Sequence, residues 1–236
     1  MIATIFDLDG TLTLKNKFLM TNFARYLTSK NIFSKDNFAI IEKDKRSYFE
    51  KKITYRQAAF RLSSVYSIAL KGVKISDIEK EAEKFVNEEV IKEYFYNYTE
   101  ALANLMKKHG ITIGISGAPK EVVVCLGKHL NFDLCHGTEV EVEKGICTGR
   151  LKQNLIIKET KEAILEKIIR ENKIDLSKSF GFGDTDQDLS FLSKVGNPIV
   201  LNPDNELLSI AKKNGWMILR AEDDVIGEIS KIIGAI

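Results

Sequence analysis

The sequence is poor in the residues that mark disulfide frameworks, thiolate metal sites and membrane spans. It has 236 residues and three cysteines. Cys125, Cys135 and Cys147 show no CxxC spacing, which argues against both a disulfide framework and a zinc site. No segment reaches the ~18 consecutive apolar residues of a membrane span, and no charged and then apolar leader opens the chain. We therefore expect a cytoplasmic protein with reduced thiols.

An excess of charge of one sign is also missing. The chain has 35 Lys and Arg residues against 33 Asp and Glu residues, so its formal net charge is only +2. This balance does not favour nucleic acid or a membrane as a partner. With 44% hydrophobic and 29% charged residues, the composition is that of an ordinary globular chain. The length suits one domain, or a core domain that carries a smaller insert.

Short apolar runs alternate with helical patterns over most of the chain. Residues 2–6 form a β-branched apolar run that ends at Asp7, which predicts a buried strand. Further strands are expected over residues 111–117, 179–182, 198–201 and 216–219, and helices over residues 99–110, 119–130, 160–172, 189–194 and from about 205. This order predicts an α/β fold in which a Rossmann-like parallel sheet is flanked by helices.

Two local signals refine this picture. Residues 138–151 alternate apolar and charged side chains around Lys144 and Gly145, which predicts a small β-hairpin. Thr99 is expected to be the N-cap of the helix that follows it.

Residues 15–97 differ from the rest of the chain. They contain no proline and no clear strand, and apolar residues recur at three- and four-residue spacings over residues 18–27, 55–70 and 78–90. We interpret this region as a helical insert, and we refer to it below as the insert. The predicted division is a core of residues 1–14 and 98–236 and an inserted helical domain of residues 15–97. Since the insert begins just after the first strand, it is placed to cover the carboxyl end of the sheet, where ligands bind in such folds.

Acidic side chains follow two of the predicted strands. Asp7 and Asp9 come directly after the first strand, and Asp184, Asp186 and Asp188 come after the strand at residues 179–182. Each motif alone is compatible with an ordinary turn or a helix start. Together they would concentrate negative charge at one sheet edge, which favours a bound cation, and oxygen ligands are those that Mg²⁺ prefers.

Two further segments could bind an anion. Ser116 and Gly117 end a strand ahead of Pro119, where a hydroxyl and backbone N–H groups could bind a phosphate. Lys161 stands near the start of a helix, where a cation is unfavourable unless an anion compensates it.

These four motifs, in this order, resemble those of the haloacid dehalogenase (HAD) superfamily. They match D-x-D-G-T at residues 7–11, the strand-end serine at Ser116, the lysine at Lys161 and G-D-x-x-x-D at residues 183–188. The insert is similar to a C1-type cap, and the hairpin and C-terminal segments are similar to the phosphoserine phosphatase-like branch, subfamily IB. The resemblance implies a HAD core with an inserted helical cap and a phosphatase activity.

The resemblance also implies roles for individual residues. Asp7 would be the nucleophile that forms an aspartyl-phosphate, and Asp9 the general acid and then the general base. Mg²⁺ would be held by Asp7, by the backbone carbonyl of Asp9 and by Asp184, with support from Asp188. The phosphate-binding set would comprise Thr11, Ser116, Gly117 and Lys161.

The residues that select the substrate are harder to predict. Phosphoserine phosphatases of this branch carry a glutamate where this sequence has Asn16, and an arginine that Arg61 could match, although Arg56 is close by. Gln187 stands where those enzymes usually carry asparagine. Phosphoserine, or a related phospho-amino acid or amino alcohol, is therefore one candidate substrate.

The expected function is a Mg²⁺-dependent phosphomonoesterase that acts on a small phosphorylated metabolite. A phosphotransferase or mutase of the same superfamily is the main alternative. A non-catalytic protein that binds a phosphorylated ligand is a weaker one, because such a protein does not need both Asp7 and Asp9. The sequence does not predict the oligomeric state.

Overall fold

A computed structural model describes residues 1–234 of the chain, except for the side chain of Tyr55. Seven strands form one sheet in the order β4-β3-β2-β1-β5-β6-β7. All neighbours pair in parallel except β3 and β4, which form an antiparallel hairpin. The strands are β1 (Ala3–Phe6), β2 (Ile111–Pro119), β3 (Leu134–Glu143), β4 (Ile146–Gln153), β5 (Phe180–Gly183), β6 (Asn197–Leu201) and β7 (Met217–Leu219). The predicted α/β class is confirmed.

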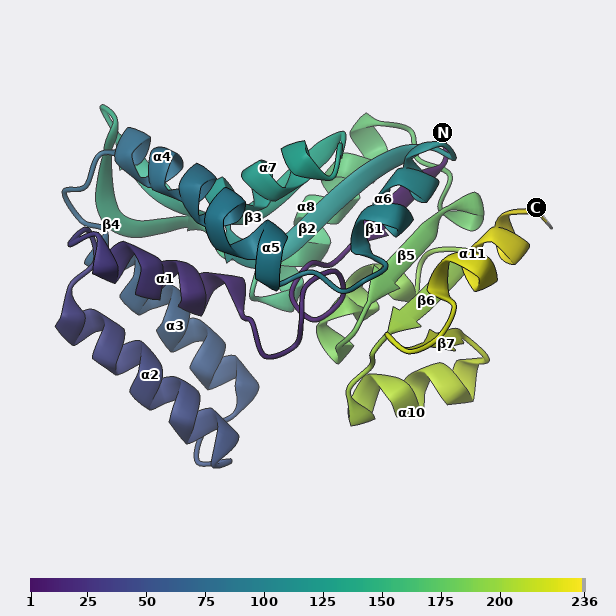
Figure 1. Cartoon of the computed structure of the whole chain (residues 1–236), viewed down its shortest axis with the longest axis horizontal. Helices are drawn as coiled ribbons and strands as arrows, with labels where there is room; N and C mark the ends of the chain where they lie inside the picture. Colours follow the sequence, from purple (N-terminus) through teal and green to yellow (C-terminus); the bar gives the residue numbers. More distant parts are fainter. Residues whose placement is uncertain (235–236) are drawn as a thin grey trace.

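Helices flank the sheet and fill the insert (Figure 1). The insert holds α1 (Leu19–Ser29), α2 (Lys35–Phe49), α3 (Tyr55–Ala69), α4 (Ile75–Phe85), the π-helix η1 (Val86–Val90) and α5 (Ile91–Glu93). The remaining α-helices are α6 (Thr99–Lys107), α7 (Lys120–His129), α8 (Lys158–Glu171), α9 (Leu189–Leu192), α10 (Asn205–Asn214) and α11 (Val225–Gly234), with 3₁₀ turns η2 (Leu176–Lys178) and η3 (Asp186–Asp188). Among the helices of residues 1–234, none has the length and apolar character needed to cross a bilayer.

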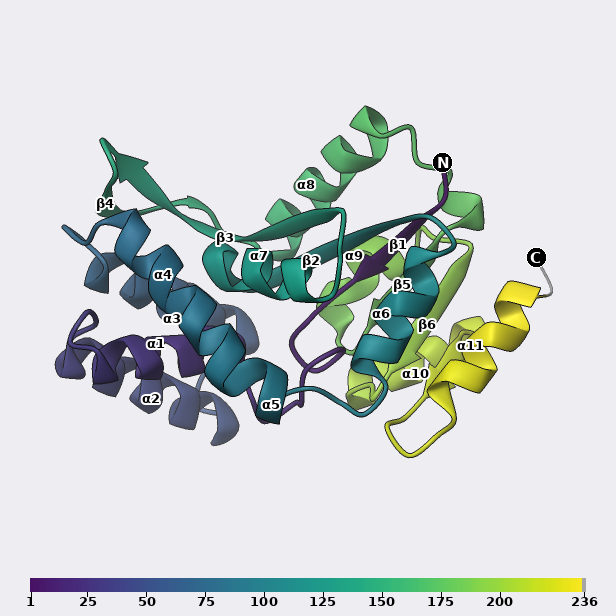
Figure 2. The ribbon, with the colours of Figure 1, turned by 45° about the horizontal axis from the view of Figure 1, so that its top comes forward.

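Strand β1 lies at the centre of the sheet and contributes to a core on each face. Successive side chains of a strand point to opposite faces. Ile5 accordingly packs in the core that contains Leu165 of α8, whereas Phe6 packs in the core of α6, α7 and α11. The Phe6 ring stacks against Phe182 of β5, with the ring centroids 4.9 Å apart. Figure 2 shows α8 on one side of the sheet and α6 and α11 on the other.

The insert is anchored to the sheet by the hairpin. α3 packs against β4, and α4 packs against α7. The backbone of Val73 and that of Cys147 in β4 are joined by a hydrogen bond of 2.9 Å from the Cys147 N–H. The buried Asn154 side chain donates a hydrogen bond of 2.8 Å to Ser63 of α3. The helical character of the insert is confirmed, while the domain boundaries at residues 14–15 and 97–98 stay a prediction.

The element boundaries differ from those expected at a few points. Thr99 is the first residue of α6 and not its N-cap, because its hydroxyl donates to the carbonyl of Leu12 at 2.6 Å. α8 begins at Lys158, two residues before the expected start. α11 was not predicted. In the hairpin turn, Lys144 and Gly145 both have positive φ values, as a tight two-residue turn requires.

Candidate active site

The carboxyl ends of β1, β2 and β5 meet at one edge of the sheet. Because β1 pairs in parallel with both neighbours, the residues that follow these strands are brought together. Asp7 follows β1, and its backbone N–H donates to Phe182 of β5 at 2.9 Å. Asp184 follows β5, and Ser116 lies near the end of β2. The structure therefore assembles the acidic motifs and the strand-end serine as the topology predicts.

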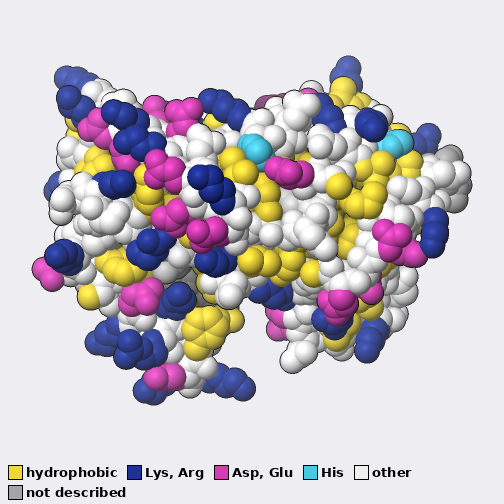
Figure 3. Space-filling view, viewed as in Figure 1, with side chains coloured by type: hydrophobic (Ala, Val, Ile, Leu, Met, Phe, Trp, Pro, Cys, Tyr) yellow, Lys and Arg dark blue, Asp and Glu magenta, His cyan; other side chains and the backbone are white. Residues whose placement is uncertain are grey.

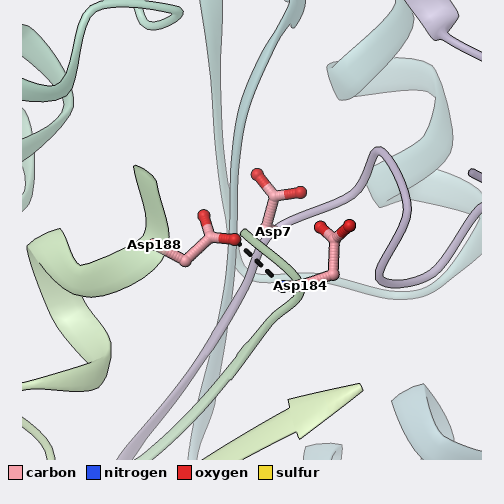
Figure 4. A group of neighbouring side chains, drawn as sticks. All are labelled: Asp7, Asp184 and Asp188. Carbon is pink, nitrogen blue, oxygen red and sulfur yellow. Dashed lines mark hydrogen bonds between the residues drawn. The ribbon is translucent and has the colours of Figure 1, made fainter. Parts of the chain in front are cut away.

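Three buried carboxylates form a compact cluster at this edge. Asp7, Asp184 and Asp188 are 7%, 3% and 1% exposed, and one oxygen from each lies within 4.8 Å of the others. Figure 4 shows the three side chains at the ends of β1 and β5 and at the end of η3. Three buried negative charges at such distances repel one another, so the cluster needs cations. The donor set, which is all oxygen, fits Mg²⁺.

Hydrogen bonds divide the three carboxylates by role. Both oxygens of Asp188 are engaged, one by Lys161 at 2.7 Å and the other by the backbone N–H of Asp184 at 3.0 Å. Asp188 is thus suited to support the site rather than to bind a metal directly. Asp7 and Asp184 are the carboxylates that could hold a metal ion. That the carbonyl of Asp9 joins them stays a prediction.

Lys161 is the central cation of the site. Its side chain is 5% exposed, and its Nζ atom lies 2.8 Å from Asp7 and 2.7 Å from Asp188. Burial by itself lowers the pKa of Lys161. The carboxylates of Asp188 and Asp7 raise it by more than burial lowers it, so its pKa lies above the ordinary lysine value. The lysine is therefore a permanent cation, and it offsets the charge of the nucleophile candidate.

The pKa values of Asp7 and Asp184 both lie above the ordinary aspartate value. Burial and the charge of Asp188 raise the pKa of Asp7 well above the ordinary value, although Lys161 opposes the rise. The same two causes raise the pKa of Asp184 to about 8, against the lowering effect of Lys15. A cation bound between Asp7 and Asp184 would lower both pKa values, which couples metal binding to deprotonation.

Asp9 lies near the cluster, and its side chain is hydrogen-bonded to the insert. Its carboxylate accepts a hydrogen bond of 2.8 Å from the backbone N–H of Leu19, the first residue of α1. Burial raises the pKa of Asp9 to about 6, while this hydrogen bond and Lys161 lower it. A carboxyl group with such a pKa can both give and take a proton near neutral pH, as a general acid and base must.

Gly10 and Thr11 shape the turn between the acidic motifs. Gly10 has a φ of +88°, and a Cβ atom at this position would lie 2.3 Å from an Asp184 carboxylate oxygen. Only glycine suits both the backbone conformation and the space. The Thr11 hydroxyl donates to Asp184 at 3.2 Å, which orients that carboxylate. The phosphate contact expected of Thr11 stays a prediction.

Ser116 and Gly117 lie in the last part of β2, which extends to Pro119 and whose register with β3 shifts between Ile115 and Pro119. The Ser116 hydroxyl is fully buried and accepts a hydrogen bond of 3.1 Å from the N–H of Ala118. A Cβ atom at Gly117 would lie 2.9 Å from the Ile156 side chain, so this glycine permits close packing of the loop that precedes α8. Their contacts with a phosphate stay predictions.

Lys15 is a residue of the site that the sequence analysis missed. Its ammonium group lies 3.3 Å from Asp184, and its side chain is 38% exposed. Its position six residues after Asp9 carries no motif that would have pointed to this contact. The lysine stands as a second cation beside the carboxylate cluster.

The three candidate specificity residues lie in different surroundings. Arg61 on α3 and Gln187 in η3 both line a cavity of about 790 Å³ between the insert and the core. Asn16 is exposed in the loop before α1 and is not part of that lining. The structure therefore brings together two of the three residues. Arg56, the alternative to Arg61, lines the same cavity, and so does Phe60, which the sequence analysis did not name.

Comparison with known proteins assigns the chain to a family. The profile of haloacid dehalogenase-like hydrolases matches residues 4–193. The chain belongs to this family. Phosphoserine phosphatase SerB1 of Mycobacterium tuberculosis is 25% identical over 219 residues, which cover 92% of this chain and 70% of that protein. Phosphoserine phosphatase of Archaeoglobus fulgidus is 27% identical over 143 residues, which cover 60% of this chain and 39% of that protein.

Solved structures share the fold of this family member. A protein of unknown function from Bordetella pertussis superposes with a TM-score of 0.76 at 18% identity, covering 94% of this chain and 99% of that one. A substrate-bound phosphoserine phosphatase superposes with a TM-score of 0.65 at 22% identity, covering 98% and 97%. The chain is thus a hydrolase of this family, and it is similar to phosphoserine phosphatases in sequence and in fold.

Proposed function

We propose that the chain is a Mg²⁺-dependent phosphomonoesterase that hydrolyses a small phosphorylated molecule through an aspartyl-phosphate on Asp7. One observation carries the proposal: the buried Lys161 ammonium group joins Asp7 and Asp188 beside Asp184. A carboxylate can attack a phosphate dianion only where cations cancel the repulsion between them. Mg²⁺, held by Asp7 and Asp184, would supply further charge neutralisation when bound.

The residues of the chain would divide the reaction as follows. The Asp7 carboxylate attacks phosphorus, and the bond from phosphorus to the leaving oxygen breaks while Asp9 donates a proton to that oxygen. Asp9, now deprotonated, takes a proton from water as the water attacks phosphorus and releases phosphate and the Asp7 carboxylate. Lys161 and the Ser116 hydroxyl orient the phosphoryl oxygens during both steps.

Release of inorganic phosphate tests this proposal. The purified chain is assayed with benzyl phosphate, O-phosphoserine, sugar phosphates and nucleoside monophosphates, with MgCl₂ or with EDTA. We expect release with Mg²⁺, loss of release with EDTA and recovery when Mg²⁺ is added in excess. Release that is unchanged by EDTA would count against the metal site. Release that requires an added acceptor alcohol would instead favour a phosphotransferase.

A further inference from the structure

A cavity of about 790 Å³ separates the insert from the core. One wall comes from the first two turns of α3, and the other from residues 156–159 and Gln187. Sites for ligands of drug size have volumes of about 300–1000 Å³, so an alcohol as small as serine would fill only a fraction of this space. Figure 3 shows the outline of the molecule indented between the insert and the lower part of the core.

The cavity adjoins the phosphate site. Ile156, which lines it, packs over Gly117 at the end of β2. Gln187, which also lines the cavity, is flanked in sequence by Asp186 and Asp188. Because the lining reaches both the end of β2, where Ser116 and Gly117 lie, and the acidic motif, the leaving group of a phosphate bound between them would extend into the cavity.

The charged side chains of the lining are mostly cationic. Arg56, Arg61 and Lys158 face a single acidic residue, Glu159, in the described part of the lining. Arg56 and Glu159 are 3.8 Å apart and are 80% and 68% exposed, so this pair is weak. Arg61 contacts the largely buried Asp44 at 3.2 Å, which holds the guanidinium group in place. A guanidinium group has five N–H donors, so Arg61 can bind a further anion.

The lining also presents an aromatic ring. Phe60 is 59% exposed although its neighbour Ala59 is buried. Ile156 and Ile157 offer apolar surface on the opposite wall. An exposed phenylalanine beside arginines suits a planar, apolar group, which can stack on the ring and on guanidinium planes.

From these features we propose that the cavity binds a leaving group that carries a planar ring and a negative charge of its own. The inference rests on the proposed phosphomonoesterase activity and names its substrate class. Phe60 would contact the ring, while Arg56 and Arg61 would contact the charge. The ammonium group of an amino alcohol such as serine would meet three cationic side chains and one carboxylate in the described lining, and its short chain would cover little of the apolar surface.

Three substrates with primary alkyl leaving alcohols, none of them an activated phenol, test the inference. They are O-phosphoserine, benzyl phosphate and 4-carboxybenzyl phosphate, each assayed with saturating Mg²⁺. We expect kcat/KM to be at least ~10-fold higher for 4-carboxybenzyl phosphate than for O-phosphoserine, with benzyl phosphate between them. The reason is that each additional contact between a leaving group and an apolar pocket raises kcat/KM.

Matched variants assign the effect to the cavity. Phe60→Ala should lower kcat/KM for both benzyl substrates by about 5–20-fold. Phe49→Ala is the control, because Phe49 is 60% exposed on α2 and lies outside the described lining; it should change kcat/KM less than about twofold. The double variant Arg56→Gln, Arg61→Gln should have equal kcat/KM values for 4-carboxybenzyl phosphate and benzyl phosphate. Thermal melts would verify that each variant is folded.

The outcomes separate the inference from the proposed function. Fastest turnover of O-phosphoserine, equal turnover of all three substrates, or equal effects of Phe60→Ala and Phe49→Ala would overturn the substrate class while phosphatase activity stands. No phosphate release from any of the three substrates with Mg²⁺ present would overturn the proposed function, and the inference with it.

Discussion

The carboxylate cluster and the cavity beside it are built in opposite ways. In the cluster, Asp7, Asp184, Asp188 and Lys161 are almost completely buried, and every one has a hydrogen-bond or ion-pair partner from another part of the chain. In the cavity, Phe60 and both arginines are more than half exposed. One region is closed and polar, and the other is open and partly apolar.

The difference indicates which part of the protein each property depends on. Buried charges tolerate little change, since removing one partner leaves another uncompensated. Exposed side chains in a cavity can be exchanged at small cost to stability. The chemistry of the reaction is therefore tied to the sheet edge, whereas the choice of substrate is tied to α3 and can vary independently. Four changes at the sheet edge test the first half of that contrast, and they are ordered from the largest expected effect to the smallest.

Asp7→Asn is expected to have the largest effect. The variant keeps the shape of the side chain but removes the nucleophile, so turnover should fall by about 10³-fold or more. Its thermal midpoint should not fall, because Lys161 keeps Asp188 as its partner and the substitution removes one of three clustered buried carboxylates. Phosphate release with Mg²⁺ and a thermal melt measure both quantities. Turnover within tenfold of the parent enzyme on several substrates would exclude Asp7 as nucleophile.

Lys161→Met should lower stability as well as turnover. Without the ammonium group, Asp7 and Asp188 are left buried beside each other, which should lower the free energy of unfolding by about 3–5 kcal/mol at pH 8 in EDTA. Lys158→Met, one turn earlier on α8, is the matched control and should change it by less than about 0.5 kcal/mol. Urea unfolding measures both values. Equal effects of the two substitutions would contradict the proposed charge balance.

The pH dependence of stability should report on Asp184. Burial and Asp188 raise its pKa from 3.8 to about 8 in the metal-free folded chain. Protonation therefore favours the folded state, and this stabilisation is complete below pH 3.8 and is lost as pH rises through about 8. The metal-free thermal midpoint should fall between pH 6 and pH 9, by about 3–6 °C more than in Asp184→Asn.

Magnesium should reverse that fall in the parent protein. The rise in thermal midpoint on adding MgCl₂ should be larger at pH 9 than at pH 6, because metal binding needs deprotonated carboxylates. In Asp184→Asn the rise in thermal midpoint should be small at both pH values. An equal gain in the two proteins would show that the ion binds elsewhere.

Lys15→Met is expected to have the smallest effect. Lys15 lies 3.3 Å from Asp184, so a bound cation must compete with its ammonium group. Because this side chain is 38% exposed, its removal should tighten Mg²⁺ binding only about 2–5-fold. Calorimetric titration with MgCl₂ measures this. Lys17→Met is the control, since Lys17 pairs with Glu93 and lies over the Tyr94 ring. Weaker binding in Lys15→Met would show that Lys15 supports the metal.

Most of the fold followed from local patterns. The apolar runs before Asp7 and Asp184 became β1 and β5, because β-branched and aromatic residues between turn signals favour buried strands. Lys144 and Gly145 formed the expected hairpin turn. The N-cap role predicted for Thr99 was wrong: Thr99 is the first residue of α6, and its hydroxyl bonds to Leu12, a residue 87 positions away that no local pattern could indicate.

The sequence by itself determined the α/β class and which side chains stand at the strand ends, because strand periodicity and turn chemistry act over a few residues. Only the tertiary structure decided which of them touch. Lys161 reaches Asp7 across 154 residues, Leu19 of the insert bonds to Asp9, and Lys15 lies against Asp184. The size and charge of the cavity were also decided there, because its walls come from segments about 100 residues apart whose distance depends on how the insert packs against the hairpin.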